Sequence, residues 1–407
     1  MVYFLLIAFL ISIFSSKTAG IGIPEITSLV IIVFTGMASI IKILSRAKMP
    51  KPLVYFWLFG LVGGISLLWA LANSVEIIWW ARRFAPIMML VVSATVSYVY
   101  GFGELERLWK WWLLIMGIGT VMLVQDIFPL VYTKVLQSVH NLQQLRFYGG
   151  GYFSALLFSM SLPYILLSHS YKGSSNSLGF FIVIITFISS SIALVISYTR
   201  TYWLATVLTS FITFLVFISR RMISWKRILQ LGSIILLITI LLMVLSPSLI
   251  LFATERFEGI FSAASDLSFL DRIEELKGIW TSSMQNPVQI LFGHGLGAKF
   301  VFYSVNPFSW NQVGWIENDY SHNYYAYTFY ATGIVGLLLF LKSWVSFLRI
   351  CLRRVKWESD PKRVVLLTSI LGMSFNLLFT LIAAPPLTSY EWSILFGIVI
   401  GTGLSLL

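Results

Sequence analysis

Long runs of apolar residues dominate the chain and alternate with short polar segments. A helix needs about 20 apolar residues to cross a bilayer, and we count twelve runs near that length. We predict membrane-spanning helices at about residues 2–16, 26–45, 52–73, 84–101, 111–130, 151–169, 178–197, 201–219, 228–252, 323–348, 364–384 and 390–407. The first run lacks a basic leader and a small-residue cleavage site, so we interpret it as an uncleaved span. The pattern predicts an all-α polytopic membrane protein in which residues 1–407 form a single integral membrane domain.

One long polar stretch, residues 254–322, interrupts this pattern between the ninth and tenth predicted spans. It holds eight of the chain's 16 carboxylates, and loops above roughly 15 residues are usually functional or disordered. Apolar residues at 273, 276, 279 and 280 have helical spacing. Ser268 would cap this helix and Asn286-Pro287 would end it. We predict an amphipathic helix across the outer face of the bundle. The Tyr- and Trp-rich segment 302–320 then reads as an ordered loop, packed at the membrane interface or stacked on sugars.

Composition and charge support the membrane assignment and orient the chain. The sequence is 58% hydrophobic and 11% charged, whereas soluble proteins are about 25% charged. The net charge of +12 could suggest nucleic acid, but the basic residues lie mainly between apolar runs, which is the positive-inside pattern. One set of alternating loops holds 17 Lys and Arg and the other holds 10. We therefore place both termini in the cytoplasm and residues 254–322 outside. A single cysteine, Cys351, excludes an intramolecular disulfide.

Several arginines of the outer loops are candidates for phosphate binding. Arg200 lies between two apolar runs with almost no loop, where a charge is expensive unless it faces a cavity or a partner. Guanidinium suits bidentate binding of phosphate. The alternative is an interfacial arginine that reaches for the membrane surface. Arg272 opens the predicted amphipathic helix, and its alternative role is a solvated charge. Weaker candidates, which otherwise anchor loops or the interface, are Arg146 before Gly149-Gly150-Gly151, Arg256, and Arg83 beside Arg82.

His322 and Asn323 begin the tenth predicted span at its outer end. An imidazole there can take a proton or donate to a phosphate oxygen, although a histidine at this position also serves as a simple cap. The four histidines have no metal-ligand spacing, and no Asp-x-Asp pair is present. The glycines at 293, 295 and 297 lack the dinucleotide-binding spacing. They predict a tight turn close to another backbone.

In their order and spacing, these pieces resemble the bacterial O-antigen ligase/polymerase family of membrane glycosyltransferases. The resemblance spans about residues 140–345. It rests on Arg146 before a Gly-rich helix start, Ser197-Tyr198-Thr199-Arg200, Arg272 followed by Trp280, Asn286-Pro287 leading into Leu291-Phe292-Gly293-His294-Gly295-Leu296-Gly297, and His322-Asn323-Tyr324 running on to Gly333-Ile334-Val335-Gly336. His294 stands where the family's glycine turn usually has another residue.

The resemblance implies a GT-C-like fold and an enzyme without a metal or other cofactor. Its donor would be a glycan on undecaprenyl diphosphate, used at the outer face of the bacterial cytoplasmic membrane. Its acceptor would be a glycan or a lipid-linked acceptor, and no nucleic acid takes part. Arg200 and Arg272 would hold the diphosphate and His322 would lie at the reacting centre. Arg146, Arg256, Arg83 and Asn323 would contact the diphosphate or glycan.

The remaining alternatives concern the base, the acceptor and the class of protein. The base would be His322, which we favour, or one of the carboxylates Asp266, Asp271, Glu317 and Asp319. A polysaccharide polymerase is our first interpretation, and a ligase that transfers the glycan to lipid A-core uses the same chemistry. A transporter or flippase would need charged residues in mid-bundle and inverted repeats. A structural scaffold would leave the outer arginines unexplained. The enzyme interpretation predicts that Arg200, Arg272 and His322 converge on one outward-facing cavity.

Overall fold

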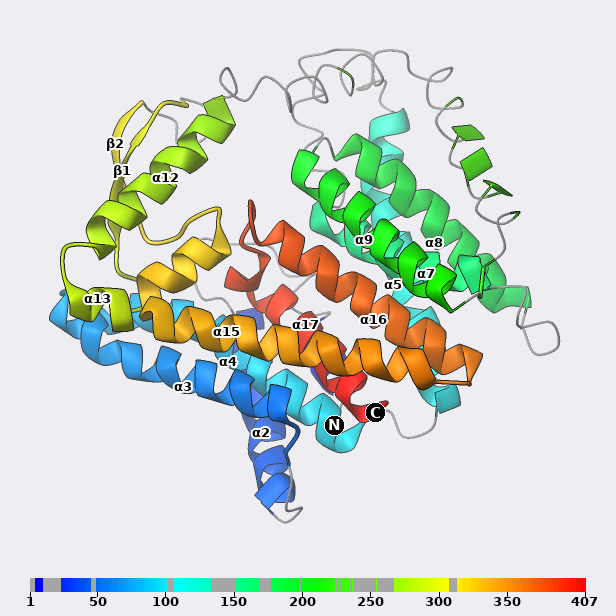
Figure 1. Ribbon diagram of the computed structural model, residues 1–407, viewed down its shortest axis with the longest axis horizontal. Helices are drawn as coiled ribbons and strands as arrows, with labels where there is room; N and C mark the ends of the chain where they lie inside the picture. Colours follow the sequence, from blue (N-terminus) through cyan, green and yellow to red (C-terminus); the bar gives the residue numbers. More distant parts are fainter. Residues whose placement is uncertain are drawn as a thin grey trace. The chain divides into compact units, whose positions relative to one another are not determined.

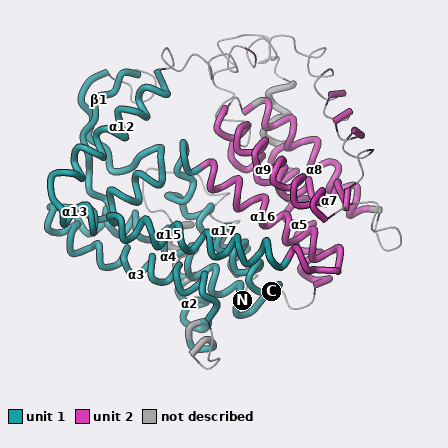
Figure 2. The backbone as a smooth tube through the Cα atoms, in the orientation of Figure 1, with its two compact units in different colours: residues 1–103, 266–354, 381–407 teal, residues 104–265, 355–380 magenta. Residues whose placement is uncertain are grey.

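The chain forms two compact units, each assembled from segments that are distant in sequence (Figure 2). Unit 1 comprises residues 1–103, 266–354 and 381–407, and unit 2 comprises residues 104–265 and 355–380. The computed structural model describes residues 4–9, 23–44, 49–101, 105–132, 151–167, 177–197, 199–220, 267–306 and 313–407, with isolated positions between 222 and 254. Each unit is treated by itself below.

Seven helices in the described residues are long and apolar enough to cross a membrane. They are α3 (Lys51–Ala72), α4 (Ile77–Tyr100), α5 (Leu105–Tyr132), α8 (Ser177–Ile196), α9 (Arg200–Ser219), α15 (Tyr324–Trp357) and α16 (Pro361–Thr380). The chain is therefore a helical, polytopic membrane protein, as its apolar runs predict. The total of about twelve spans stays a prediction, because most of the expected spans 2–16 and 228–252 lie outside the described residues.

Unit 1 is built around α4 and the C-terminal helix α17 (Tyr390–Ser405), which share a long contact. The contact is close because small residues face each other: Gly397 of α17 lies against Ser93 and Ala94 of α4. Gly401, one turn later, lies against the same stretch of α4. Small residues spaced by four are the usual means of bringing membrane helices together. Helices α2 (Ile23–Leu44) and α3 also pack on α4.

Unit 2 packs α7 (Gly151–Leu167) against α8, α9 and α16, with α5 against α8 (Figure 1). Buried hydroxyl and amide groups connect its helices. Thr120 of α5 and Thr186 of α8 are hydrogen-bonded at 2.8 Å. The Asn376 side chain of α16 donates to hydroxyls of α7 and α9, each at 3.4 Å. Polar contacts of this kind join helices within an apolar bundle.

The polar stretch forms two helices and a hairpin: α12 (Leu267–Ser283), α13 (Pro287–Phe292), β1 (Phe300–Ser304) and β2 (Gly314–Asn318). The predicted helix is present as α12, but its expected boundaries are wrong. Ser268 lies inside the helix instead of capping it. Asn286 caps the next helix, where its side chain accepts a hydrogen bond from the Val288 amide. Asparagine is a preferred N-cap, and Pro287 follows it at the first helical position.

The hairpin occupies part of the segment 302–320, which the sequence suggests is an ordered loop. β1 and β2 are antiparallel, with Tyr303 paired to Trp315. Alternate side chains Phe300, Phe302 and Ile316 are buried and pack in one cluster with Ile279 of α12 and Tyr330 of α15. The strand period of two therefore leaves one face of the hairpin packed and the other exposed.

The glycine turn after α13 packs against the start of α15, as its sequence predicts. Gly293 has φ of 77°, and a Cβ there would lie 2.5 Å from the Ala331 backbone. α15 itself contains a non-helical residue, Gly333, at φ 67°, which lies against the backbone at Leu291. The two positive-φ glycines thus allow two backbones to approach too closely for any side chain.

Candidate functional site

The buried side of α12 carries two carboxylates. Asp271, Glu275, Ile279 and Ser283 are buried and follow one another at intervals of four residues. Of the apolar residues whose spacing predicts this helix, Ile279 is buried, whereas Leu276 and Trp280 are 39% and 62% exposed. Buried carboxylates are costly unless they are hydrogen-bonded. Here both are hydrogen-bonded, by segments that are distant in sequence.

Asp271 holds the end of the hairpin's first strand. It is 2% exposed and accepts from the amides of Val305 and Asn306 at 2.7 and 3.1 Å. The Ser304 hydroxyl donates to it at 3.1 Å. With three donors on one carboxylate, Asp271 ties α12 to the hairpin. Its contacts favour a structural role over that of the alternative base considered above.

Glu275 holds His322. The glutamate is 1% exposed, and its carboxylate accepts from the Ser321 hydroxyl at 2.9 Å and the His322 amide at 3.0 Å. Its second oxygen lies 2.7 Å from His322 Nδ1. Because an ionised carboxylate only accepts, the hydrogen of that contact lies on Nδ1. Nε2 is then the ring nitrogen that Glu275 does not hold. The contact orients the imidazole.

Arg272 lies on α12, three residues before Glu275. Residues three apart on a helix are neighbours, about 5–6 Å apart at Cβ. Arg272 is half-buried, and the histidine bound to Glu275 is also partly exposed. Arg272 and the residue that holds His322 therefore lie within one turn of each other on α12, and a cavity shared by Arg272 and His322 stays a prediction.

Arg83 binds a carboxylate of the segment that precedes His322. Its guanidinium donates to both oxygens of Asp319, at 2.9 Å from Nε and 2.6 Å from Nη2. It also lies over the Tyr320 ring, 5.4 Å from the centroid, and that ring is 6.2 Å from the His322 ring. Burial, aided by the charge of Glu275, raises the pKa of the Tyr320 phenol above its ordinary value. Arg83 lies within α4, which begins seven residues earlier than the predicted span.

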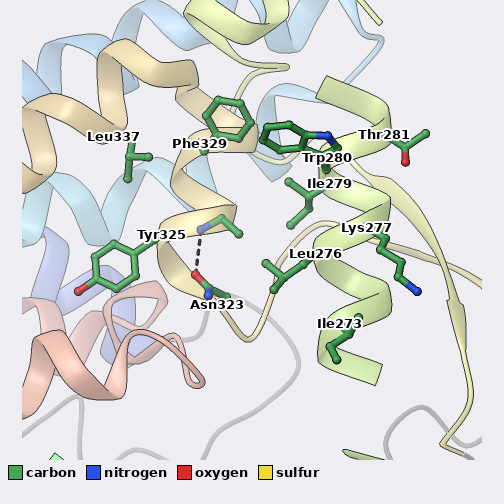
Figure 3. A pocket seen from close by; sticks show the side chains of 11 residues that line it. Ile273, Leu276, Lys277, Ile279, Trp280, Thr281, Asn323, Tyr325, Phe329 and Leu337 are labelled. Atoms are coloured by element: carbon green, nitrogen blue, oxygen red, sulfur yellow. Dashed lines mark hydrogen bonds between the residues drawn. The ribbon is translucent and has the colours of Figure 1, made fainter. Parts of the chain in front are cut away.

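Asn323 caps α15 and borders a pocket. Its side-chain oxygen accepts from the Ala326 amide at 2.9 Å. The pocket has a volume of about 580 Å³ and lies between α12 and the start of α15. In Figure 3, Leu276 and Trp280 project from α12 toward the α15 side, where Phe329 and Asn323 lie. The lining of the pocket is mainly apolar. One of its residues, Asn323, directly follows His322 in the sequence. The apolar residues whose spacing predicts α12 thus line this pocket.

Arg200 lies in unit 2, at the first residue of α9. Gly151, the first residue of α7, lies against the Tyr202 ring, and Tyr152 and Tyr202 have centroids 5.6 Å apart. The starts of α7 and α9 are therefore neighbours at one end of the unit. Two other predicted ligands, Arg146 and Arg256, and the carboxylate Asp266 lie outside the described residues. Convergence of Arg200 with Arg272 and His322 stays a prediction.

The other carboxylate candidates differ in setting. Glu317 is exposed on the hairpin and pairs with Lys299 at 3.4 Å, whereas Asp319 is engaged by Arg83. Across the described ranges, no three His, Cys, Asp or Glu side chains gather as metal ligands. Sequence reasoning misses Glu275, the residue with the most direct contact to His322. Its four-residue spacing from Asp271 was the available signal, since acids one turn apart share a helix face.

Comparison with known proteins gives a family match over part of the chain. A search of curated proteins finds no match to the chain. Residues 185–341 match the family model described as O-antigen ligase. The matched range begins in α8 and includes Arg200, α12 with Glu275, the hairpin and His322. Together with the membrane helices, it indicates an integral bacterial membrane protein. The match supports the assignment of this chain to the O-antigen ligase/polymerase family.

Proposed function

We propose that the protein is a membrane glycosyltransferase that moves a glycan from undecaprenyl diphosphate to a hydroxyl of an acceptor. The reaction takes place at the outer face of the cytoplasmic membrane, with both termini in the cytoplasm. The observation that carries the proposal is the Glu275–His322 pair beside an apolar pocket. The family match supports a ligase or polymerase role of this kind.

The Glu275–His322 pair supplies the base. The acceptor hydroxyl attacks the anomeric carbon of the donor sugar, and the bond from that carbon to the phosphate oxygen breaks. The hydroxyl proton passes to His322 Nε2, and the electron pair leaves with the lipid diphosphate. Glu275 stabilises the imidazolium that forms, as a carboxylate does in other histidine-based catalytic sites.

Arginines supply the positive charge that the leaving diphosphate requires. Fixed charges directed at the group that becomes more negative are commonly the largest catalytic contribution. Arg272 lies one turn from Glu275, and we assign it to the diphosphate together with Arg200, Arg146 and Arg256. This arrangement performs the electrostatic task of a metal ion, so the proposed reaction is metal-independent.

The apolar pocket suits the polyprenyl end of the donor. Its lining of Leu276, Trp280, Phe329 and Leu337 is apolar, and burying isoprenyl carbons there is favourable by about 25 cal/mol per Å². Asn323 lies at the same pocket and adjoins His322. A lipid in the pocket would therefore place its diphosphate close to the imidazole.

The acceptor distinguishes two forms of this activity. A polymerase uses a second lipid-linked glycan, and a ligase uses lipid A-core. We propose the polymerase first, because the residues of the site do not single out an acceptor and polymerisation requires only one kind of substrate. The family description, O-antigen ligase, favours the second candidate.

The test is transfer by the purified full-length protein in nanodiscs. Native undecaprenyl-diphosphate glycan is supplied alone, or with lipid A-core, and released undecaprenyl diphosphate and product length are measured. Chain growth without lipid A-core indicates a polymerase, and a single transfer that needs it indicates a ligase. His322→Ala should lower the rate about 10²- to 10⁴-fold, the usual contribution of a positioned base.

Parallel variants and a chelator test the rest of the scheme. Arg200→Ala and Arg272→Ala should slow transfer with unchanged thermal unfolding, and EDTA should have no effect. The proposal is wrong if the wild type releases no lipid diphosphate with either acceptor. It is also wrong if His322→Ala, Arg200→Ala and Arg272→Ala all keep full activity.

A further inference from the structure

The outer face of the β1–β2 hairpin presents a pair of exposed aromatic rings. Tyr303 and Trp315 are cross-strand partners, with centroids 5.5 Å apart and planes at 83°. Tyr303 is 41% exposed and Trp315 is 73% exposed. Tyr and Trp offer large, rigid contact areas at little cost in conformational entropy. Exposure of both rings on one small strand pair is the arrangement of a binding surface.

The opposite face fixes the hairpin to the unit. Phe300, Phe302 and Ile316 are buried in the cluster with Ile279 and Tyr330. Gly278 of α12 approaches the hairpin so closely that a Cβ there would lie 2.5 Å from the Val301 carbonyl oxygen. The Tyr330 hydroxyl donates to the Lys299 carbonyl at 2.7 Å. The aromatic pair is thus presented on a supported backbone.

Charged groups beside the rings indicate a polar occupant. Strand alternation puts Glu317 on the same face as Trp315, and Glu317 pairs with Lys299 at 3.4 Å. Both side chains are about 60% exposed, at 61% and 60%. Any medium that surrounds Trp315 therefore also surrounds the Glu317 carboxylate. Burial of a carboxylate in hydrocarbon is strongly unfavourable. Flat apolar rings next to hydrogen-bonding groups match a sugar, whose ring faces carry C–H groups and whose edges carry hydroxyls.

The aromatic face is continuous with the candidate site. The chain continues from β2 through Asp319 to His322, so the proposed base lies seven positions after Trp315. A chain of that length spans at most about 23–25 Å. A glycan of a few sugars with one end at His322 can therefore reach the rings.

We propose that this outer face, which consists of Tyr303 and Trp315 with Lys299 and Glu317 beside them, is a saccharide platform. It binds sugar units of the donor or growing glycan. These units lie several sugars away from the glycosidic bond that reacts. The proposal rests on the proposed function, since it takes the substrate to be a glycan. The platform gives the protein affinity for long chains without adding to the chemical step.

Saccharide binding is measured first without turnover. The probe is a lipid-free oligosaccharide of two to four repeat units, released from the native donor by mild acid. It is titrated calorimetrically into His322→Ala protein in nanodiscs, with and without Trp315→Ala. We expect Trp315→Ala and Tyr303→Ala each to weaken binding about 3- to 10-fold. Trp315→Phe should retain most of the affinity. Trp357→Ala, which removes an equally exposed tryptophan at the end of α15, should change nothing.

Kinetics and membrane accessibility complete the experiment. In a wild-type background, Trp315→Ala should raise KM for long glycans and leave kcat unchanged. A nitroxide on Val301→Cys, in a Cys351→Ala background, should be accessible to a water-soluble nickel complex and lose mobility when the oligosaccharide is added. A label accessible to oxygen but not to nickel would show that the membrane covers this face and would overturn the platform. Equal affinities of the Trp315→Ala and Trp357→Ala proteins would do so too. Absence of transfer by the wild type would instead refute the proposed function, while the binding titration still reports on the platform.

Discussion

The polar stretch of unit 1 and the helix bundle of unit 2 satisfy their buried polar groups in different ways. In unit 2, most buried hydroxyls bond to a carbonyl of their own helix: Ser159 donates to the Ala155 carbonyl at 2.8 Å, and Ser374 to the Ile370 carbonyl at 2.7 Å. A few, such as Thr186 with Thr120, also link two helices. In the polar stretch, Asp271 and Glu275 bond to segments more than 30 residues away. Local bonds of the first kind add little to tertiary specificity, whereas the second kind positions the site.

This difference has a direct energetic consequence. Removal of a hydroxyl from the bundle takes away one modest hydrogen bond. Removal of Asp271 or Glu275 leaves several buried donors without an acceptor, and each such donor costs about 1–3 kcal/mol. Sensitivity to substitution should therefore concentrate in α12 and its partners, although the bundle contains far more buried residues.

The largest effect should come from Glu275→Gln. The amide cannot stabilise the imidazolium, and it disturbs the tautomer of His322. We expect kcat for transfer to fall roughly 10²-fold, the lower end of what a positioned base contributes. Because the pair acts as a unit, Glu275→Gln should cost little more in a protein that already carries His322→Ala. The measurement is single-turnover release of undecaprenyl diphosphate.

The matched control is the neighbouring Glu274. Its carboxylate lies on the surface of α12, 2.6 Å from the Lys277 ammonium. Glu274→Gln should retain wild-type rates. If Glu274→Gln and Glu275→Gln lose activity equally, the effect belongs to the net charge of the helix. The assignment of Glu275 to His322 would then be withdrawn.

Substitutions at Arg83 distinguish a structural role of this residue from a role in substrate binding. The sequence analysis expects Arg83 to bind diphosphate, whereas the structure shows it bound to Asp319. Arg83→Met alone should destabilise the protein by about 2 kcal/mol, since it leaves a largely buried carboxylate unpaired. The double variant Arg83→Met/Asp319→Leu should recover most of that loss, because apolar replacement of a buried pair is often neutral.

Activity of the double variant decides between the two roles. If Arg83 only holds the segment before His322, transfer should recover together with thermal stability. If stability returns while KM for the donor stays raised, Arg83 contacts the substrate as the sequence analysis expects. Arg82→Met, which removes the adjacent arginine that lies 5.5 Å from the Trp79 ring centroid, serves as the control for charge alone.

The membrane helices could be predicted from sequence because their physics is local. A run of apolar residues must form a helix in lipid, since every backbone group needs an internal partner. The predicted spans 52–73 and 201–219 agree with α3 and α9 to within one residue at each end. α4 begins earlier than predicted because Trp79, Arg82 and Arg83 continue the helix beyond its apolar core.

The site could be predicted only in part because its contacts are long-range. His322 and Arg272 could be proposed as candidates from residue type and position. Glu275 could not be distinguished from Glu274 by composition, because burial depends on which face of α12 packs against the hairpin. That hairpin was itself missed: Val301, Phe302, Tyr303 and Trp315 lie among loop-forming residues, and strand pairing depends on the partner segment.

The comparison of Asp271→Asn with Thr186→Val separates the two regions most cleanly. Asp271→Asn removes the charge that accepts from Val305, Asn306 and Ser304, and it should destabilise the hairpin by about 1–3 kcal/mol. Hydrogen exchange of the β1 and β2 amides should then accelerate, while the amides of α9 keep their protection. Thr186→Val in α8, which removes the hydrogen bond to Thr120, should cost below about 1 kcal/mol and leave the hairpin unchanged.

The pattern of amide hydrogen exchange tests the contrast between the two regions. Asp271 accepts hydrogen bonds from the end of β1 and the residues after it, whereas His322 is held by Glu275. Transfer with short donors should therefore persist in Asp271→Asn while protection of the hairpin falls. Uniform acceleration of exchange throughout both units would mean that stability is shared evenly along the chain. The contrast between a locally satisfied bundle and a polar stretch held by remote carboxylates would then fail. Acceleration confined to β1 and β2 would show that the hairpin beside the candidate site depends on Asp271, as the contrast requires.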